Sequence, residues 1–584
     1  MTFLPKLTRL DGDPRNVNHS ALDIETWGLN AIEDGSSFAI GDVYDERGHR
    51  RFADRDSMVR WLRSRDNDGR VFWAHNGGRY DYLSLFGNYL KTLRPIMVGG
   101  RLIEFRTNNG KNVTRFRDSM NLFPTALAKI GEKLGFPKGE TPQKFKDADR
   151  AAGITEEDWT YLERDCEIVY RAIQELQTEF GEVRSTIPSL ALYHFRRNYL
   201  RDDYFIRTGL DNDARLAYYG GRVEAYYIGK VAQPPLYYDI NSLYPYAMIT
   251  TDFPDPSQLA AFQGPPPSGL MGVVFGRAHV PRGLDPPPLP LRVPDKLLFP
   301  VGTFTGAWAT PEYELALSLG VTFDIERSIV APRIPSPFVG YVESIYAKKE
   351  AEEGFKREMY KLMLNALYGK FGEAHKEQSD YAEHYDREYH AELEKEHKTV
   401  VRWDPLSTRR SDGFYRWGTE ENKRAAHSVY VWAATITSQA RVLNYRTQRR
   451  LLDSGARILY TDTDSFMLTD AEAPSDLVGK ALGQLKLESK TVTEIWGAKY
   501  YVAKEEDGTE TLYLKGVKKG SEPTAWTLDR RPASYGFRSI VGARESIVRR
   551  LPAGSPKWVV RSALTQYQKR TVQPSGCTAP IEIA

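Results

Sequence analysis

Aspartates follow apolar, strand-like runs at two places in the chain. Asp239 comes after the run Pro235–Tyr238, and Asp462 and Asp464 lie in a turn between two further runs. Carboxylates buried between apolar strands cost free energy unless a cation neutralises them. Hard divalent cations prefer such oxygens, and two of them about 3.5–4 Å apart catalyse phosphoryl transfer. The three acids therefore indicate a two-metal site, although the segment with Asp462 and Asp464, taken alone, would also fit an ordinary polar turn.

A proline-free run, Ala347–Phe371, predicts one helix with a cationic face. Four side chains of this run recur at helical spacing and so share one face. They are Arg357, Lys361, Asn365 and Tyr368, and Lys349 lies near the edge of the same face. Two cations, an amide and an aromatic ring suit contacts with a triphosphate and a base. The alternative is a solvated basic surface.

A second set of acids lies nearer the N-terminus. Asp23 and Glu25 alternate on a predicted strand, so both side chains project from the same face. Asp81 follows another predicted strand, and Tyr161 and Asp165 are neighbours on a predicted helix. Acids from three elements could hold two metal ions for hydrolysis, with Tyr161 orienting the attacking water. A pair such as Asp23 and Glu25 is common by chance, so the set matters more than the pair.

Several elements must position these side chains. The predicted strands are Ala21–Glu25 and Val71–Ala74, and the predicted helices are Thr155–Leu176 and His427–Leu451. Thr155 and the acids after it approximate a capping box. The proline-rich stretch 264–299 predicts loops, and the highly charged stretch 372–423 predicts an exposed insertion.

Length and composition place limits on the class of protein. The 584 residues allow about three or four domains. The net charge of +3 decides nothing, but residues 521–584 are locally basic, which fits either phosphate contacts or a solubilising surface. The two cysteines, Cys166 and Cys577, have no neighbours with which to form a cysteine-rich zinc site. We find no signal peptide or long apolar run and expect no membrane contact.

Three segments resemble, in order, the polymerase motifs of family B DNA polymerases. Asp239–Pro245 resembles DxxSLYP, 361–369 resembles KLxxNSxYG with Ala366 in place of Ser, and Tyr460–Ser465 resembles YxDTDS. The resemblance implies that Asp239, Asp462, Asp464 and the Ile240 carbonyl bind metal. It implies nucleotide contacts for Tyr244, as a sugar gate, and for Lys349, Lys361, Asn365 and Tyr368, to which the helical face adds Arg357. Lys499 and Tyr501 are similar to the family's KxY element, which holds the primer terminus, and Lys515-Gly516 resembles a basic-Gly pair.

The N-terminal acids resemble the three proofreading motifs DxE, Nx(2–3)(F/Y)D and YxxxD. The resemblance implies a 3′–5′ exonuclease with Asp23, Glu25, Asp81 and Asp165 as metal ligands, Tyr161 as a catalytic residue, and Lys138 or Lys144 as an auxiliary lysine. The residues expected to grip single-stranded DNA are Thr26, Asn76, Tyr80, Ser119 and Met120, the last replacing a more usual Leu.

The resemblance is closest to the protein-primed branch of small bacteriophages and linear plasmids. Tyr218-Tyr219-Gly220-Gly221 matches that branch's YxGG element, so Tyr218, Gly220 and Gly221 are expected to touch template. We expect an α/β and α+β multidomain fold: a ribonuclease H-like exonuclease domain and a right-hand polymerase with two insertions. The expected boundaries are exonuclease 1–185, palm 186–250 and 426–520, fingers 346–371, thumb 521–584, an insertion contacting a terminal protein at 251–345, and a strand-displacement insertion at 372–425.

The resemblance also sets the expected cofactors and partners. We expect two Mg²⁺ ions per active site, with Mn²⁺ as an alternative. The expected partners are template and primer DNA, dNTPs and a terminal protein. The chain is expected to be a monomer in the cytoplasm, that of the host cell if it is viral. Three other readings stay open: a family B polymerase that uses a nucleic-acid primer or none, a degenerate polymerase that only binds DNA, and a nuclease alone.

Overall fold

The computed structural model describes most of the chain. The described residues are 5–15, 17–28, 37–87, 89–93, 95–98, 100–108, 113–294, 296–376, 380–382, 404–405, 415–417, 422–489, 491–504, 508–515, 517, 534–549, 551, 554–562 and 567–583. Most of the expected second insertion, 372–425, lies outside them, as do Gly516 and the first part of the expected thumb. Every candidate site residue falls within the described part.

The N-terminal region contains a seven-stranded mixed sheet in the order β4-β3-β2-β5-β8-β7-β6. Its strands are β2 (His19–Thr26), β3 (Phe38–Asp45), β4 (Gly48–Phe52), β5 (Val71–Ala74), β6 (Ile96–Val98), β7 (Arg101–Asn108) and β8 (Val113–Asp118). β2, β5 and β8 run parallel, and the other neighbours pair antiparallel. The carboxyl ends of β2, β5 and β8 therefore meet at one edge, where the N-terminal acids lie. Both predicted strands of this region are confirmed.

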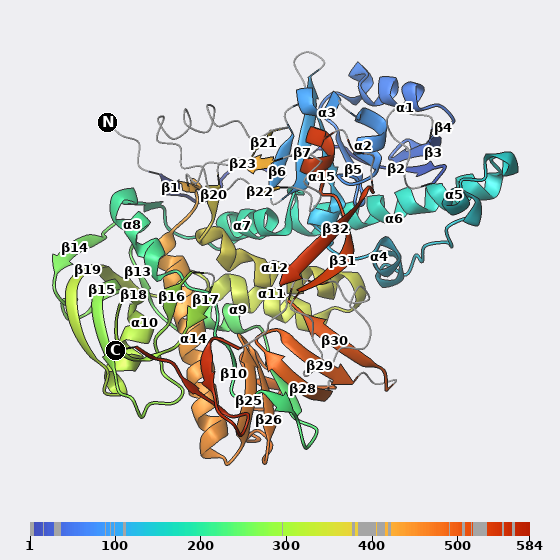
Figure 1. The fold of residues 1–584 in the computed structure, drawn as a ribbon. Coiled ribbons are helices and arrows are strands. Elements are labelled where there is room, and N and C mark those ends of the chain that lie inside the picture. Colours follow the sequence, from blue (N-terminus) through green and yellow to red (C-terminus); the bar gives the residue numbers. More distant parts are fainter. Residues whose placement is uncertain are drawn as a thin grey trace.

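Helix α6 (Glu156–Phe180) packs on β2 and β3 and crosses one face of this sheet (Figure 1). Its first turn carries the predicted capping box between Thr155 and Asp158, so its predicted start is confirmed. Tyr161 and Asp165 are both buried on the side of the helix that faces the sheet's acidic edge. The helix thus supplies the third element of the predicted acidic set.

A second sheet has the order β10-β25-β26-β12-β27 and is antiparallel throughout. Its strands are β10 (Val223–Ala225), β12 (Leu236–Ile240), β25 (Arg457–Asp462), β26 (Ser465–Thr469) and β27 (Leu485–Glu488). Helices α9 (Leu243–Ile249) and α14 (Tyr430–Asp453) accompany it, and α14 packs against β25. The predicted hairpin around Asp462 and Asp464 is confirmed, and so is the helix predicted from His427 to Leu451.

The single helix predicted for Ala347–Phe371 is wrong. The structure has two helices, α11 (Val339–Ala351) and α12 (Gly354–Phe371), which pack against each other. Gly354 has φ +56°, and a Cβ there would lie 2.8 Å from the Lys133 carbonyl oxygen. The break therefore places α12 close to the N-terminal domain, which helix propensity alone does not reveal.

The proline-rich stretch 264–299 is also more regular than predicted. It contains β15 (Leu270–Val280), a central strand between β18 (Val301–Ala309) and β19 (Thr322–Ile334). The prolines stand on either side of β15, and the strand itself is free of proline. Short strands β16 (Leu291–Val293) and β17 (Lys296–Leu298) follow as a hairpin. A sheet is therefore the main regular structure of the expected first insertion, with β13 (Phe253–Pro254) and β14 (Ala260–Gln263) at its margin.

The C-terminal residues reach two distant parts of the molecule. Helix α15 (Ala543–Arg549) packs near β7 and α2 (Asp81–Phe86), and its Ala543 and Ile547 join the core of the N-terminal sheet. The last strand, β35 (Glu582–Ile583), pairs in parallel with β18, so the C-terminus lies beside the insertion sheet (Figure 1). Among the described residues, no helix has the length and apolar character that a membrane crossing needs.

Candidate active sites

Two strands bring Asp239 and Asp464 together. β12 pairs with β26 so that Asp239 stands opposite Ser465, the residue after Asp464. The Ile240 N–H donates to the Asp464 carbonyl at 2.7 Å, and the Asp464 N–H donates to the Asp462 carbonyl at 2.7 Å. The two carboxylates predicted from separate motifs thus become neighbours, with Asp239 on β12 next to Ile240 and Asp464 in the turn before β26.

The turn between Asp462 and Asp464 is fixed by backbone contacts. Thr463 has φ +63°, and its N–H donates to the Arg222 carbonyl at 2.7 Å. From α14, the Asn444 side-chain amide donates to the Thr463 carbonyl at 3.0 Å and to Thr461 Oγ1 at 3.2 Å. A Cβ on Gly221 would lie 2.5 Å from the Thr463 side chain, so the glycine permits a close approach. Sequence reasoning missed Asn444, because a polar residue on a long helix carries no motif.

Burial raises the pKa of both carboxyl groups. The pKa of Asp239 rises to about 7, through desolvation first and then through repulsion from Asp464 and Glu488, which Lys486 and Lys361 oppose. The pKa of Asp464 rises to about 6, again mainly through desolvation. Two carboxyls that repel each other in a partly buried site favour a bound divalent cation, since its charge would stabilise both ionised forms. The residues present therefore fit a metal centre.

Asp462 is already paired within the chain. Its Oδ2 lies 3.1 Å from Lys499 Nζ and accepts a hydrogen bond from the Tyr460 hydroxyl at 3.3 Å. Lys499 itself has φ +62°, and its N–H donates to the same Tyr460 hydroxyl at 3.0 Å. The structure thus brings Lys499 to the acids, although the two motifs are far apart in sequence.

Aromatic rings form the side of this site next to α12. Tyr244 and Tyr368 stack with ring centroids 4.1 Å apart and planes 11° apart. Lys361 and Asn365 on the same helix are exposed. Arg357 is engaged within the chain. It donates a hydrogen bond to the Lys349 carbonyl at 2.8 Å and so caps the end of α11. Lys349 pairs with Glu350 at 3.0 Å.

The Tyr218–Gly221 element is held from α14. Arg441 Nη1 donates to the carbonyls of Tyr219 and Gly220, both at 3.0 Å, while its other nitrogens bind the buried carboxylate of Glu312. Burial raises the pKa of Tyr218, and the nearby Tyr368 hydroxyl contributes to the same shift. Arg441 and Glu312 were not predicted, because their roles depend on elements that meet only in the folded chain.

The remaining predicted primer contacts lie on a neighbouring sheet. Tyr501 is largely buried on β29 (Tyr500–Lys504) and stacks on Tyr513 with centroids 4.8 Å apart. Lys515 follows β30 (Glu510–Leu514) and is exposed. Lys569 was not predicted. Its Nζ donates to the Val223 carbonyl at 2.9 Å, and Val223 pairs with Asp462, so this lysine is a further cation near the acids.

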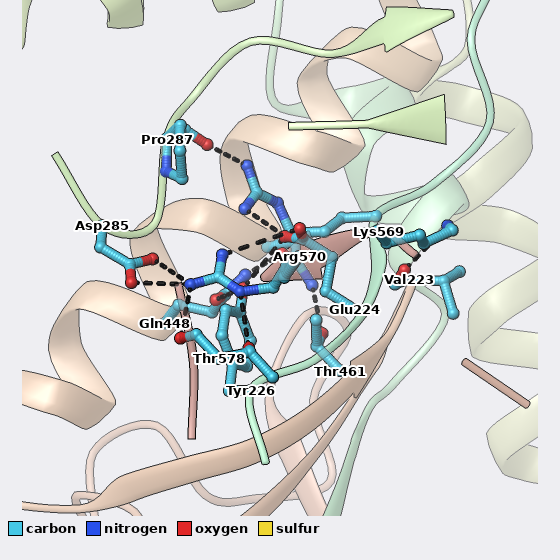
Figure 2. Close-up of polar contacts among 12 residues, drawn as sticks. Val223, Glu224, Tyr226, Asp285, Pro287, Gln448, Thr461, Lys569, Arg570 and Thr578 are labelled. Carbon is cyan, nitrogen blue, oxygen red and sulfur yellow. Dashed lines mark hydrogen bonds and ion pairs between the residues drawn. The ribbon is translucent and has the colours of Figure 1, made fainter. Parts of the chain in front are cut away.

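A buried ion network ties the C-terminal residues to this sheet. Figure 2 shows Arg570 between Glu224 and Asp285, and Lys569 next to Val223. Arg570 contacts Asp285 at 2.7 Å and lies 3.7 Å from Glu224, which also pairs with Arg222 at 2.9 Å. The side chains of Arg570 and Glu224 are fully buried. The network therefore fixes the edge strand β10 next to Asp462.

The N-terminal acids line a pocket of about 510 Å³. The site residues predicted from the sequence that line this pocket are Asp23, Glu25, Thr26, Asn76, Tyr80, Asp81, Met120, Lys138, Tyr161 and Asp165. Carboxylate oxygens of Asp23, Glu25 and Asp165 all lie within 4.8 Å of one another, close enough to share a metal ion. The structure therefore brings together acids that are 142 positions apart in sequence.

The electrostatics of this pocket also fit a divalent cation. Desolvation, with repulsion from Asp23, raises the pKa of Glu25 to about 8, and desolvation raises the pKa values of Asp23 and Asp81. Asp165 is buried, and its Oδ1 has no hydrogen-bond partner among the described residues. A buried carboxylate oxygen without a donor is costly, and a metal ion would satisfy it.

The structure separates the two candidate lysines. Lys138 lines the pocket, where its ammonium donates to the Tyr161 hydroxyl at 2.7 Å and pairs with Asp165. Lys144 instead pairs with Asp158 and donates to the Gly153 carbonyl at 2.9 Å, and it does not line the pocket. Thr141, which sequence reasoning missed, contacts the Tyr161 hydroxyl at 2.9 Å.

Asp118 organises the loops that carry the predicted strand-gripping residues. Its carboxylate accepts backbone hydrogen bonds from Asn76 at 2.9 Å, Gly78 at 3.1 Å and Met120 at 2.9 Å. Ser119 is buried beneath the pocket and contacts His75 Nδ1 at 3.0 Å. Asp118 was not predicted, although it directly precedes Ser119 and could have been read as a cap.

Comparisons with known proteins agree with this arrangement. The family model for DNA polymerase type B, organellar and viral, matches residues 140–414. The chain is 25% identical over 477 residues to the DNA-directed DNA polymerase of Enterobacteria phage PRD1, covering 79% of this chain and 78% of that protein. It is 26% identical over 508 residues to a probable DNA polymerase of Podospora anserina, covering 72% of this chain but 41% of that protein.

A solved structure shares the fold. The ternary complex of Phi29 DNA polymerase with primer-template DNA and incoming nucleotides superposes with a TM-score of 0.69 at 18% identity, over 94% of this chain and 100% of that chain. The expected arrangement of a nuclease-like domain and a right-hand domain is therefore confirmed as a fold.

Proposed function

The chain belongs to the type B DNA polymerases, organellar and viral, and from this premise we propose that it extends DNA at the Asp239–Asp464 site. The observation that carries the proposal is the pairing of these two carboxyls beside the Tyr244–Tyr368 stack and the exposed Lys361 and Asn365 of α12. Acids on one side and cations on the other suit a nucleoside triphosphate and its metal ions.

Each residue has a proposed part in the reaction. Two divalent ions, for which we propose Mg²⁺, would supply Lewis acidity at Asp239 and Asp464, with Asp462 and the Ile240 carbonyl completing the set. Lys361 neutralises the triphosphate, with Lys349 beside it and Arg357 fixing the break between the helices. Tyr244 lies under the sugar, and Asn365 and Tyr368 contact the nascent pair. Lys499, Tyr501 and Lys515 hold the primer, and Tyr218, Gly220 and Gly221 touch the template.

A primer-extension assay tests this site. Asp464→Asn should lower the rate at least about a thousandfold, because loss of metal binding removes several kcal/mol of stabilisation. Its binding of primer-template should be kept. Asp470→Asn is the matched control, since Asp470 is an exposed aspartate that follows β26. Equal extension by Asp464→Asn and Asp470→Asn would contradict the proposal.

For the N-terminal pocket we propose 3′–5′ exonuclease activity. Asp23, Glu25, Asp81 and Asp165 would hold the metal ions, and Tyr161, positioned by Lys138 and Thr141, would orient the attacking water. Thr26, Asn76, Tyr80 and Met120 line the pocket and would hold the single-stranded end, with Ser119 supporting His75 beneath them. Lys144 has no proposed catalytic role.

Degradation of a labelled single strand tests the pocket. Asp23→Asn with Asp165→Asn should remove degradation and leave extension within about twofold of the parent chain. Lys144→Gln, which removes a lysine outside the pocket, is the control and should keep both activities. Degradation that survives the double change would rule out this pocket.

We further propose that priming uses a hydroxyl of a terminal protein, that residues 251–345 contact that protein, and that residues 372–425 serve strand displacement. The proposal rests on the resemblance of Tyr218–Gly221 to the YxGG element of the protein-primed branch and on the size of these segments. The PRD1 polymerase is a relative from a bacteriophage. Since that relative belongs to a bacteriophage, we place the activity in the host-cell cytoplasm. Labelled dNTP, incubated with the chain and a candidate terminal protein, should become attached to that protein. Extension from a DNA primer with no such labelling would favour nucleic-acid priming instead.

A further inference from the structure

A pocket lined by arginines lies at the other end of the N-terminal sheet. It has a volume of about 210 Å³, and its arginines are Arg15, Arg106, Arg115, Arg117 and Arg184. His19 and Val71, the first residues of β2 and β5, also line it. The acidic pocket lies beyond the opposite ends of these strands. At about 3.3 Å per residue, His19 is about 13 Å from Asp23, so the two pockets are separate.

The positive charge of this pocket exceeds its negative charge. Glu104 accepts hydrogen bonds from Arg106 Nε at 2.6 Å and from Arg117 Nε at 2.7 Å, and Arg115 Nε lies 3.9 Å away. Glu182 pairs with Arg184 at 3.2 Å. Two carboxylates therefore face the arginines of the pocket, and one of them is shared by three guanidinium groups.

Several donors of the pocket lack acceptors. Arg184 Nε is buried without a hydrogen-bond partner in the described part of the chain. Arg15 is exposed and makes no hydrogen bond or ion pair with any described residue. Burial, with the nearby charges of Arg115 and Arg184, lowers the pKa of Arg117 against the effect of Glu104. An anion in the pocket would satisfy these donors and offset the repulsion between the cations.

We infer that this pocket binds a phosphate group of single-stranded nucleic acid. Guanidinium groups match the geometry of phosphate oxygens and remain charged when partly buried. The volume suffices for a tetrahedral oxyanion, since a water molecule occupies about 30 Å³ in the liquid. Arg106, Arg115 and Arg184 stay partly exposed, so a strand can reach the pocket from solvent. Such a contact would position a strand apart from both reaction centres, and it does not depend on the proposed activities.

Binding of a labelled single-stranded oligonucleotide to the full chain tests the inference. The parent carries Asp23→Asn and Asp165→Asn so that the strand stays intact. Arg15→Gln with Arg115→Gln removes two cations of the pocket and leaves the buried Arg117–Glu104 pair in place. Arg50→Gln with Arg65→Gln is the matched control, since both residues are exposed arginines of the same region outside the pocket.

The expected result is a change in salt dependence. Each lost phosphate contact should make the slope of log affinity against log salt shallower by about 0.7 for a single strand. The control should keep the parent slope. A second arm measures the rise in unfolding temperature caused by inorganic phosphate at constant ionic strength, and this rise should shrink only in the pocket variant.

Each outcome decides the inference. Changes in both arms, or in the salt slope alone, support a backbone phosphate as the ligand. A change in the phosphate arm alone assigns the pocket to a free phosphate and overturns the nucleic-acid part. No difference from the control in either arm overturns the inference that this pocket binds a phosphate group. If the double variant does not fold, Arg15→Gln alone, at an exposed position, carries the same comparison.

Discussion

At the scale of single residues, the central feature is a pair of carboxyls whose ionisation the fold opposes. Burial raises the pKa of Asp239 to about 7 and that of Asp464 to about 6. The metal-free folded chain therefore holds protons that the unfolded chain releases near pH 4. Its stability falls as pH rises through this interval. Bound divalent cations would replace those protons.

This linkage predicts a pH-dependent metal affinity. Metal ions compete with protons for Asp239 and Asp464, so binding should weaken as pH falls from about 7 to about 5. The rise in unfolding temperature caused by Mn²⁺ should be larger at pH 8 than at pH 5. Metal binding in the N-terminal pocket should depend on pH in a similar way, so that pocket is first disabled by Asp23→Asn with Asp165→Asn. The Mn²⁺ effect on unfolding temperature is then compared between this variant and the same variant with Asp239→Asn added. An equal Mn²⁺ effect with and without Asp239 would contradict a metal at this site.

Tyr244 carries a second prediction at this scale. Its ring is fixed by the stack on Tyr368, so it cannot easily move away from a bulkier sugar. Tyr244→Val should raise the use of ribonucleotides relative to deoxyribonucleotides by about tenfold or more, as expected for one lost steric contact. Tyr246→Val is the control, because Tyr246 lies on the same helix but against Gly483. Unchanged sugar discrimination in Tyr244→Val would show that Tyr244 does not select against ribonucleotides.

The sequence predicts the acids well and the residues that orient them poorly. Asp23, Glu25, Asp239 and Asp464 stand in short motifs beside apolar strands, a local signal. Asn444, Arg441 and Asp118 act through elements that are remote in sequence, and nothing near them marks their partners. The choice between Lys138 and Lys144 also needed the tertiary structure, since both lysines lie in the same short stretch of sequence before α6.

At the scale of elements, the hairpin that carries Asp464 depends on a close approach from Tyr218–Gly221. Gly221→Ala should place a methyl group 2.5 Å from the Thr463 side chain and displace the turn. We expect extension to fall at least about tenfold, since small misplacements of reacting groups cost large factors, while degradation is kept. Gly209→Ala is the control, since Gly209 has no proposed role in either site and a Cβ there meets nothing within 4 Å. Full extension by Gly221→Ala would show that the turn tolerates the shift.

Element boundaries were predictable where apolar patterns are local. The strands around the acids and the start of α6 follow from alternation and from the capping box. The break between α11 and α12 did not, because Glu352 and Glu353 are good helix formers. The left-handed backbone of Gly354 and its close approach to the Lys133 carbonyl are seen only in the folded chain. The strand β15 was hidden by the prolines on both sides of it.

At the scale of the whole molecule, the C-terminal residues join parts that are distant in sequence. β35 extends the insertion sheet, and Arg570 lies buried between Glu224 of β10 and Asp285. A two-residue strand and a single arginine give no sequence signal for such contacts. The same segment places Lys569 on the Val223 carbonyl, next to the strand that carries Asp462, so the end of the chain packs against the site.

Removal of the buried arginine should therefore weaken the whole assembly. Arg570→Ala removes the positive charge that neutralises the carboxylates of Glu224 and Asp285, and it should lower the free energy of unfolding by about 3 kcal/mol. Urea denaturation followed by circular dichroism measures the change. Arg282→Ala removes an exposed ion pair with Glu582 in the same segment and should cost less than about 1 kcal/mol. Equal effects of the two changes would mean that the network does not hold the C-terminal segment in place.

The most direct measurement uses one labelled primer-template with and without dNTPs. The parent chain should shorten the primer without dNTPs and lengthen it with them. Asp239→Asn should only shorten it, and Asp23→Asn with Asp165→Asn should only lengthen it. Loss of both reactions in either variant, with the chain still folded, would contradict the central claim that two separate acidic centres carry out two reactions.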